Sequence, residues 1–231
     1  MDLTNGVKPI IISAGIGHHY VAGIDRLERS LMYEGWGGDM RFWRNEYPFG
    51  CPEHGGDGQY NFKPYCFNEV FLNGHKVVVW CDSSLWCVRN PMPLFDYVND
   101  NGLYFFKSGY SLAETATDKL LEYAGVKREE LVDVSEFATG LIGINIENPL
   151  GKEFFETWHQ YMKDGMFGGN RVHDENDSKH PLFKFSRQDQ SAASMVLYKM
   201  GITTAGETND FQAYKNTGHN PEKILFFIGG L

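Results

Sequence analysis

The sequence predicts an α/β fold in which helices flank an open, mostly parallel central sheet. Two short apolar runs, residues 9–14 (PIIISA) and 75–80 (HKVVVW), show no alternation with polar residues. Such runs are typical of strands that are buried on both faces of a sheet. Segments with apolar residues at helical spacing separate these runs along the chain. This alternation of strands and helices indicates a mainly parallel sheet.

The first strand and the first helix open an α/β unit. Three isoleucines follow a proline in residues 9–14, which favours a buried strand. Apolar residues then recur at helical spacing from Val21 to Leu31, so we expect a helix over residues 20–34. Gly35 stands where this helix should end, a position that glycine often occupies.

The next three elements lead to the most apolar run of the chain. Aromatic residues predict a short strand over residues 40–43, and helical spacing predicts a helix over residues 62–72. Asn73 and Gly74 end that helix. Residues 75–80 should then form a central strand that is covered on both faces.

Glycines delimit several elements of the second half of the chain. Gly125 and Gly201 each follow a segment with helical spacing, as expected at the ends of helices. The helix expected over residues 151–163 is amphipathic. The expected strands cover residues 102–106 and 141–146, and the expected helices cover residues 112–124, 151–163 and 188–200.

We expect a single domain over residues 1–231, with two mobile loops. Residues 48–60 are rich in proline and glycine, and residues 167–184 are polar and without periodicity. The second loop is interpreted as a lid that closes over a ligand. A second metal site is the alternative, because the loop contains His173, Asp174, Asp177 and His180.

Composition excludes several classes of protein. The formal net charge of −9 argues against a nucleic-acid-binding protein, which normally presents a basic surface. No stretch approaches the roughly 20 apolar residues of a transmembrane helix, and the N-terminus lacks a signal-peptide pattern, so a cytoplasmic protein is expected. The four cysteines form no C-x-x-C motif, which favours reduced structural thiols.

Asp82 follows the central strand, and this position has functional meaning. Ligands of open α/β sheets bind at the carboxyl ends of the strands. The loop SAGIGHHY after the first strand should lie at the same edge of the sheet. This loop contains Gly15 and Gly17, but Tyr20 replaces the third glycine of a dinucleotide fingerprint, so a nicotinamide-dependent dehydrogenase is a weak alternative.

Four motifs occur in order along the chain: NFKPYCFNEVF, VVVWCDSS, SEFATGLIGIN and SRQDQSAASMVLYKMG. Together they resemble the motifs of nucleotide-sugar-dependent glycosyltransferases of the GT-A fold, a Rossmann-like architecture. VVVWCDSS is similar to the strand that ends in their Asp-x-Asp motif, and NFKPYCFNEVF to the lysine-bearing helix before it. SEFATGLIGIN resembles their F-N-x-G-V strand, and SRQDQSAASMVLYKMG their DQ helix. The matches span about residues 9–201. Ser84 stands in place of the second acid, and Ala138 in place of the asparagine.

The resemblance implies transfer of a sugar from a nucleoside diphosphate to the hydroxyl group of a glycan or another acceptor. A UDP-sugar is the expected donor, and retention of anomeric configuration is favoured over inversion. Mn²⁺ or Mg²⁺ would stabilise the departing diphosphate, and both ions prefer oxygen ligands. The implied donor-binding residues are Ala14, Gly15, Tyr20, Lys63, Asp82, Ser83, Thr139 and Gly140; the metal ligands are Asp82, Ser84 and His219; the catalytic residues are Asp189 and Gln190.

Several of these residues have a second interpretation. Asp82 would also suit the cap of a turn, and Tyr20 either stacks on a nucleotide base or packs in the first turn of a helix. Lys63 and Arg26 either offset diphosphate charge or are solvated. Asp189 lies three residues after Ser186, which fits a capping box as well as a position near the sugar.

The function itself has an alternative from another class. Because the second acid of Asp-x-Asp is Ser84, a non-catalytic protein that binds a nucleotide sugar or a carbohydrate also fits the sequence.

Overall fold

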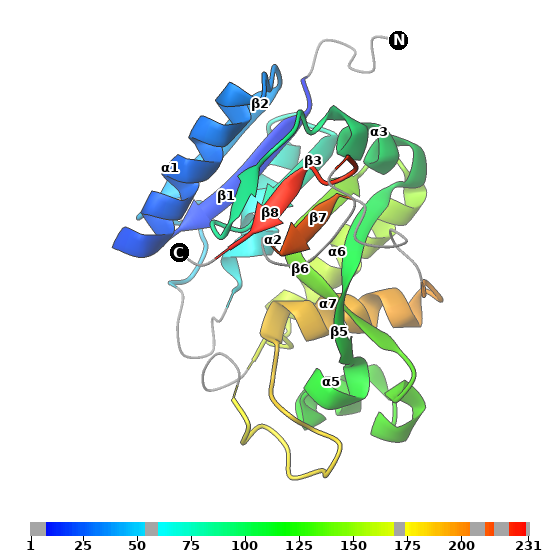
Figure 1. The fold of residues 1–231 in the computed structure, drawn as a ribbon. Helices are drawn as coiled ribbons and strands as arrows, with labels where there is room; N and C mark the ends of the chain where they lie inside the picture. Colours follow the sequence, from blue (N-terminus) through cyan, green and yellow to red (C-terminus); the bar gives the residue numbers. More distant parts are fainter. Residues whose placement is uncertain (1–7, 54–59, 169–173, 204–210, 215–221, 230–231) are drawn as a thin grey trace.

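A five-stranded sheet forms the centre of the computed structural model, which describes residues 8–53, 60–168, 174–203, 211–214 and 222–229 (Figure 1). The strand order is β2-β1-β3-β6-β5. The strands are β1 (Ile10–Gly15), β2 (Asp39–Arg44), β3 (Val77–Cys81), β5 (Leu103–Ser111) and β6 (Ser135–Asn145). Strands β1, β2 and β3 are parallel, and β6 is antiparallel to both β3 and β5. The predicted mostly parallel sheet is confirmed, with β6 as its reversed strand.

Helices cover both faces of this sheet (Figure 1). Alternate residues of β1 pack on opposite sides: Ile10 and Ile12 belong to the core beneath α2, α6 and α7, and Ile11 to the core beneath α1 and α3. This double burial is why polar residues do not alternate in the strand. The helices are α1 (His18–Tyr33), α2 (Phe62–Leu72), α3 (Met92–Asn101), α4 (Leu112–Thr115), α5 (Asp118–Ala124), α6 (Pro149–Lys163) and α7 (Gln188–Lys199), and a 3₁₀ helix, η2, spans Arg128–Leu131.

The reversed direction of β6 determines what lies beside the end of β3. Cys81, the last residue of β3, pairs with Leu141. Because β6 continues past this pair, Thr139 and Gly140 lie at the carboxyl end of β3, and the backbone N–H of Asp82 donates to the carbonyl of Gly140 over 2.8 Å. The middle of one strand is thus placed against the end of another.

The helix predicted over residues 112–124 is divided in two. Ala116 and Thr117 have extended backbone angles between α4 and α5. The hydroxyl of Thr117 accepts a hydrogen bond from the N–H of Leu120 and caps α5. A side chain that can cap a helix therefore interrupts a segment whose apolar spacing alone predicts continuity.

Other elements are absent from the sequence prediction. Helix α3 begins beside Pro91 and Pro93, since proline is well suited to the first turn of a helix. A small second sheet has the order β4-β8-β7, formed by Leu85–Cys87, Phe226–Ile228 and Gln212–Tyr214. Strands of three residues are too short for a periodic pattern.

The described part of the predicted loop at residues 167–184 is held against α4, α5 and η2. The hydroxyl of Ser178 donates to Asp118 over 2.7 Å, His180 contacts Glu129 over 3.1 Å, and the N–H of Lys184 donates to the carbonyl of Glu114 over 2.8 Å. Polar groups of this segment thus form hydrogen bonds with neighbouring elements. The predicted lid movement remains a prediction.

All four cysteines are free thiols in the structure, and their reduced state in solution remains a prediction. Burial raises the pKa of Cys66 and of Cys81, which makes these thiols poor nucleophiles. Within the described ranges, no helix combines the length and the apolar character needed to cross a membrane.

Replacing Gly151 by alanine is expected to destabilise the protein by about 1–3 kcal/mol. A Cβ atom at this position would lie 2.1 Å from the carbonyl oxygen of Asn145 and 2.7 Å from that of Gly102, so backbone would have to move. Gly37→Ala is the control, because a Cβ atom there meets no other atom within 4 Å. Denaturant unfolding of both variants measures the effect; equal stability of the two variants would contradict this account of α6 packing.

Candidate functional site

Asp82 lies at the carboxyl end of β3, as its position in the sequence indicates. Its Oδ1 atom accepts a hydrogen bond from the indole N–H of Trp80 over 2.6 Å and lies 3.2 Å from the Nζ atom of Lys63. About a third of the side chain, 35%, is exposed. Burial raises the pKa of Asp82, and the ammonium of Lys63 and the indole of Trp80 offset part of that rise. The carboxylate is therefore oriented by two donors at one oxygen.

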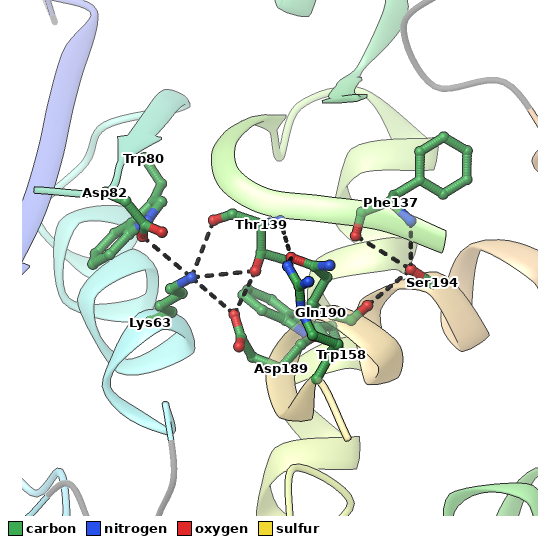
Figure 2. A network of polar contacts seen from close by, with 10 residues as sticks. Lys63, Trp80, Asp82, Phe137, Thr139, Trp158, Asp189, Gln190 and Ser194 are labelled. Carbon is green, nitrogen blue, oxygen red and sulfur yellow. Dashed lines mark hydrogen bonds and ion pairs between the residues drawn. The ribbon is translucent and has the colours of Figure 1, made fainter. Parts of the chain in front are cut away.

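Lys63 is a buried cation at the centre of the site (Figure 2). It lies in the first turn of α2 and is only 2% exposed. Its Nζ atom is 2.9 Å from Asp189 Oδ2, and it donates to the carbonyl oxygen and to the hydroxyl of Thr139 over 3.1 and 3.2 Å. Burial alone would lower the pKa of Lys63, but Asp189 and Asp82 more than offset this effect and raise the pKa. The interpretation of Lys63 as a solvated helix residue is wrong.

Asp189 faces Lys63 instead of the first turn of its own helix. The hydroxyl of Thr139 donates to Asp189 Oδ2 over 2.7 Å, and the side chain is almost completely buried. The N-cap of α7 is Arg187, which makes no side-chain capping bond. The capping box of Ser186 and Asp189 is therefore wrong: the Ser186 hydroxyl accepts from the side-chain amide of Gln188. An ion pair with a buried lysine outweighs one local capping bond.

Gln190 has a fixed amide orientation. Its Oε1 atom accepts hydrogen bonds from the Arg187 guanidinium over 3.0 Å and from the backbone N–H of Thr139 over 3.3 Å. Its Nε2 atom donates to Glu136 over 2.6 Å. Because a guanidinium and a backbone N–H only donate, and the opposite carboxylate accepts, the amide cannot be flipped. The carbonyl oxygen of Gln190 thus faces Thr139 (Figure 2) and the guanidinium of Arg187.

Glu136 is a site residue that the sequence analysis missed. Its carboxylate is completely buried in β6 and accepts hydrogen bonds from Ser108, Gln190 and Ser191 over 2.7, 2.6 and 3.2 Å. The signal in the sequence was the one charged residue of the strand SEFATGLIGIN. A buried carboxylate requires partners, but the sequence does not tell which ones.

The loop after β1 reaches the same edge of the sheet as Asp82. Gly15 is needed for a close approach, since a Cβ atom there would lie 2.9 Å from the backbone carbonyl of Tyr20. The N–H of Gly17 donates to the side chain of Asn45, and Gly17 has a φ of 92° that favours glycine. Tyr20 is in the first turn of α1 and is 53% exposed, so it is not a core residue.

Arg26 holds the turn after β3. Its guanidinium donates to the backbone carbonyls of Ser83 and Ser84 over 3.4 and 3.0 Å, and it lies 4.7 Å from the ring centroid of Trp86. Ser83 is buried beneath this turn. The expected role of Arg26 in offsetting diphosphate charge remains a prediction, and the contacts in the structure assign it to shaping the loop that follows Asp82.

The structure brings together most of the residues expected in the site. Asp82, Lys63, Thr139, Asp189 and Gln190 form one connected network. Gly140 adjoins Asp82, and Ala14 and Gly15 end the neighbouring strand β1. His219 lies outside the described residues. Within the described ranges, no group of three histidine, cysteine, aspartate or glutamate side chains is placed to hold a metal ion.

A divalent cation would find one carboxylate oxygen here. Asp82 Oδ1 is occupied by Trp80 and Lys63, whereas no residue of the described part hydrogen-bonds to Oδ2. The hydroxyls of Ser83 and Ser84 are further oxygen atoms in the same turn. This donor set fits a hard cation that takes its remaining ligands from a phosphate group and water.

Comparisons with solved structures identify the fold. The structure is similar to that of the bifunctional glycosyltransferase WbbM, with a TM-score of 0.54 and 13% sequence identity over 97% of this chain and 46% of that chain. The protein has a glycosyltransferase fold of the GT-A type. This chain spans about half the length of WbbM. The fold implied by the sequence motifs is therefore confirmed.

A second solved structure has a lower score. It is the galactosyltransferase LgtC in complex with donor and acceptor sugar analogues, with a TM-score of 0.48 and 15% identity over 95% of this chain and 86% of that chain. No protein-family model and no curated protein sequence matches the chain.

Replacing Lys63 by methionine is expected to destabilise the protein by about 3–5 kcal/mol, because Asp189 would be left buried without its cation. The double variant Lys63→Met with Asp189→Asn should recover part of this loss. Lys152→Met is the control, since Lys152 is 62% exposed and its 3.8 Å pair with Glu156 contributes little. Urea unfolding measures all three variants; an equally unstable double variant would show that the loss does not come from the unpaired carboxylate.

Two substitutions of Glu136 should differ sharply. Glu136→Leu removes an acceptor from three donors and should cost about 3 kcal/mol or more. Glu136→Gln should cost less than about 1.5 kcal/mol, because its oxygen can face Gln190 while its amide donates to Ser191, whose hydroxyl also lies 3.0 Å from the carbonyl of Thr115. The measurement is chemical denaturation, and equal losses would contradict the assigned hydrogen bonds.

Proposed function

We propose that this protein is a glycosyltransferase that moves a sugar from a nucleoside diphosphate donor, with a UDP-sugar expected, to an acceptor hydroxyl. The observation that carries the proposal is the buried network of Lys63, Asp189, Thr139 and Gln190 beside Asp82, at the carboxyl end of β1 and β3. Ligands of open α/β sheets bind at this edge. The GT-A fold of the chain supports the same conclusion.

The network suits the charge that develops during glycosyl transfer. The sugar passes through a transition state with positive charge near its anomeric carbon, as in glycoside hydrolysis. Asp189 and the carbonyl oxygen of Gln190 are fixed oxygen atoms that would stabilise this charge without reorganisation. These two residues are the proposed catalytic groups.

The contacts of Asp189 favour retention of configuration. An inverting enzyme needs a carboxylate that accepts the proton of the acceptor hydroxyl. Asp189 Oδ2 already receives the Thr139 hydroxyl and lies 2.9 Å from the Lys63 ammonium. An oxygen atom that already accepts from two donors has its lone pairs engaged, which suits an electrostatic role. Stabilisation of the sugar cation is therefore its proposed role.

The charge balance supports use of a divalent cation. Lys63 lies between Asp82 and Asp189, so its positive charge is already matched within the protein. A diphosphate that enters this site brings further negative charge. Mn²⁺ or Mg²⁺ bound with the donor would stabilise the departing diphosphate, with Asp82 and Ser84 as the described residues proposed to hold it and His219 as a further proposed ligand.

Ala14, Gly15, Tyr20 and Ser83 complete the proposed donor site. The half-exposed ring of Tyr20 is placed at the start of α1, where it would stack on the nucleotide base. Thr139 and Gly140 lie on β6, which is on the other side of β3 from this loop. A non-catalytic nucleotide-sugar-binding protein is the second candidate, favoured by Ser84 at the position of the missing acid.

Calorimetric titration with UDP and GDP, with Mn²⁺ and with chelator, tests the proposal. One nucleotide is expected to bind in a metal-dependent manner, and Asp82→Ala should weaken this binding by roughly tenfold or more. Asp189→Asn should lower the rate of sugar transfer by about 100-fold. Asp96→Ala, a change on the exposed side of α3, is the control and should leave both quantities unchanged.

The outcomes separate the two candidates. Full transfer by the Asp189→Asn variant would overturn the catalytic assignment, and binding of nucleotide and sugar without turnover would support the non-catalytic candidate. A protein that binds neither nucleotide would show that the network around Lys63 is only structural.

A further inference from the structure

A partly exposed group of two aromatic rings and two cations lies next to Gln190. Tyr110, near the end of strand β5, and Phe185 meet edge to face with their ring centroids 5.1 Å apart. The guanidinium of Arg187 lies 5.9 Å from each ring centroid, and the ammonium of Lys184 lies 5.6 Å from that of Tyr110. Tyr110, Phe185 and Arg187 are named the aromatic platform below.

Arg187 and Lys184 differ in what neutralises them. Lys184 forms an ion pair with Glu114. Among the described residues, no carboxylate lies within ion-pair distance of Arg187, and its one hydrogen bond there goes to the neutral carbonyl of Gln190. A guanidinium has five N–H donors, so most of its donors and all of its charge are available to a ligand. A half-buried cation of this kind suits a carboxylate or phosphate group.

Hydrogen bonds connect the aromatic platform to Gln190, one of the proposed catalytic residues. The N–H of Tyr110 donates to the hydroxyl of Ser108, which donates to Glu136 over 2.7 Å. The same Glu136 oxygen accepts from Gln190 over 2.6 Å. The buried carboxylate of Glu136 therefore fixes both the end of β5 that carries Tyr110 and the side-chain amide of Gln190. A ligand on the platform would be placed at a defined distance from Gln190.

The aromatic platform and Asp82 lie at opposite ends of one series of contacts. Contacts run in order from Asp82 to Lys63, from Lys63 to Thr139, from Thr139 to Gln190, and from Gln190 to Arg187. Because the diphosphate of the donor is proposed to lie at Asp82, Arg187 is at the opposite end of this series. An anionic group that binds Arg187 would therefore belong to the acceptor, not to the donor.

We propose that Tyr110, Phe185 and Arg187 form the acceptor subsite, and that the acceptor is a sugar that carries an anionic group, a carboxylate or a phosphate. The apolar face of the sugar would lie on the aromatic rings, and its anionic group would bind the Arg187 guanidinium. This inference rests on the proposed glycosyl transfer and adds the chemical class of the acceptor to it.

The test measures binding of methyl glucuronide and methyl glucoside without any donor, by NMR titration. These probes share one ring and differ in a carboxylate. The glucuronide is expected to bind about tenfold more tightly, and salt should reduce the difference. Arg187→Gln should abolish the preference while leaving glucoside binding unchanged, and Arg187→Lys should retain part of it. Tyr110→Leu should weaken both probes alike.

Arg29→Gln is the matched control, because it removes one exposed arginine on α1 that makes no contact with the platform. Its preference for the glucuronide should equal that of the original protein. Circular dichroism establishes that each variant is folded. Equal binding of the two probes by the original protein would overturn the proposal, as would a preference that survives Arg187→Gln in a folded variant.

A competition experiment distinguishes the two ends of the site. UDP should leave the binding of the glucuronide unchanged, since the diphosphate is proposed to lie at Asp82. Displacement of the glucuronide by UDP would overturn the acceptor assignment and give Arg187 to the donor. Because these experiments need no turnover and no bound donor, they can fail while the proposed transferase function holds, and the reverse is also true.

A second pair of probes tests which anion fits best. If the guanidinium recognises negative charge of either kind, glucose 6-phosphate should bind more tightly than glucose, and this preference should also depend on Arg187. A preference that holds for the carboxylate alone would restrict the acceptor class to uronic acids. Loss of Arg187 dependence for both anions would overturn the proposal.

Discussion

The ion pairs of Lys63 with Asp82 and Asp189 are the interaction on which the rest of the site depends. Burying an ammonium group is costly unless opposite charges and acceptors surround it. Here one lysine joins α2, the end of β3, the middle of β6 and the start of α7, through Asp82, Thr139 and Asp189. Four elements that are distant in sequence therefore have one arrangement in which this charge is satisfied.

The direction of β6 makes that arrangement possible. A parallel strand in this place would bring its own carboxyl end to Asp82, whereas the antiparallel strand presents residues from its middle. Thr139 and Glu136 therefore lie on a rigid strand instead of a loop, and α7 packs against the same strand through Ser194, whose hydroxyl accepts from the N–H of Phe137. Gln188, at the start of α7, has a φ of 38°, which is unfavourable for a residue with a side chain. This backbone conformation immediately precedes Asp189 and Gln190, which link α7 to Lys63 and to β6.

The sequence predicted the fold better than it predicted the partners within the site. The helix at residues 62–72 has the predicted bounds, because the spacing of its apolar residues and the Asn-Gly pair that follows them indicate the same end. Asp82 directly follows strand β3, as predicted. Local patterns do not contain the direction of β6 or the identity of a distant partner. Asp189 is an example. Ser186, three residues before it, predicted a capping box, but the position of the Asp189 side chain is determined by Lys63, more than a hundred residues away.

The two ends of the site differ in how far they are organised before a ligand arrives. Two side chains at Gln190 are held by several hydrogen bonds each: the amide by Arg187, Thr139 and Glu136, and Glu136 in turn by Ser108 and Ser191. Such preorganisation is what stabilises a developing charge, because no dipole has to turn during the reaction. Beyond Gln190 the rings of Tyr110 and Phe185 and the arginine that adjoins them are partly exposed, so they form a surface that a ligand must complete. The network around Gln190 is thus rigid because its charges are satisfied within the protein, and the proposed acceptor surface would be selective because the charge of Arg187 is not.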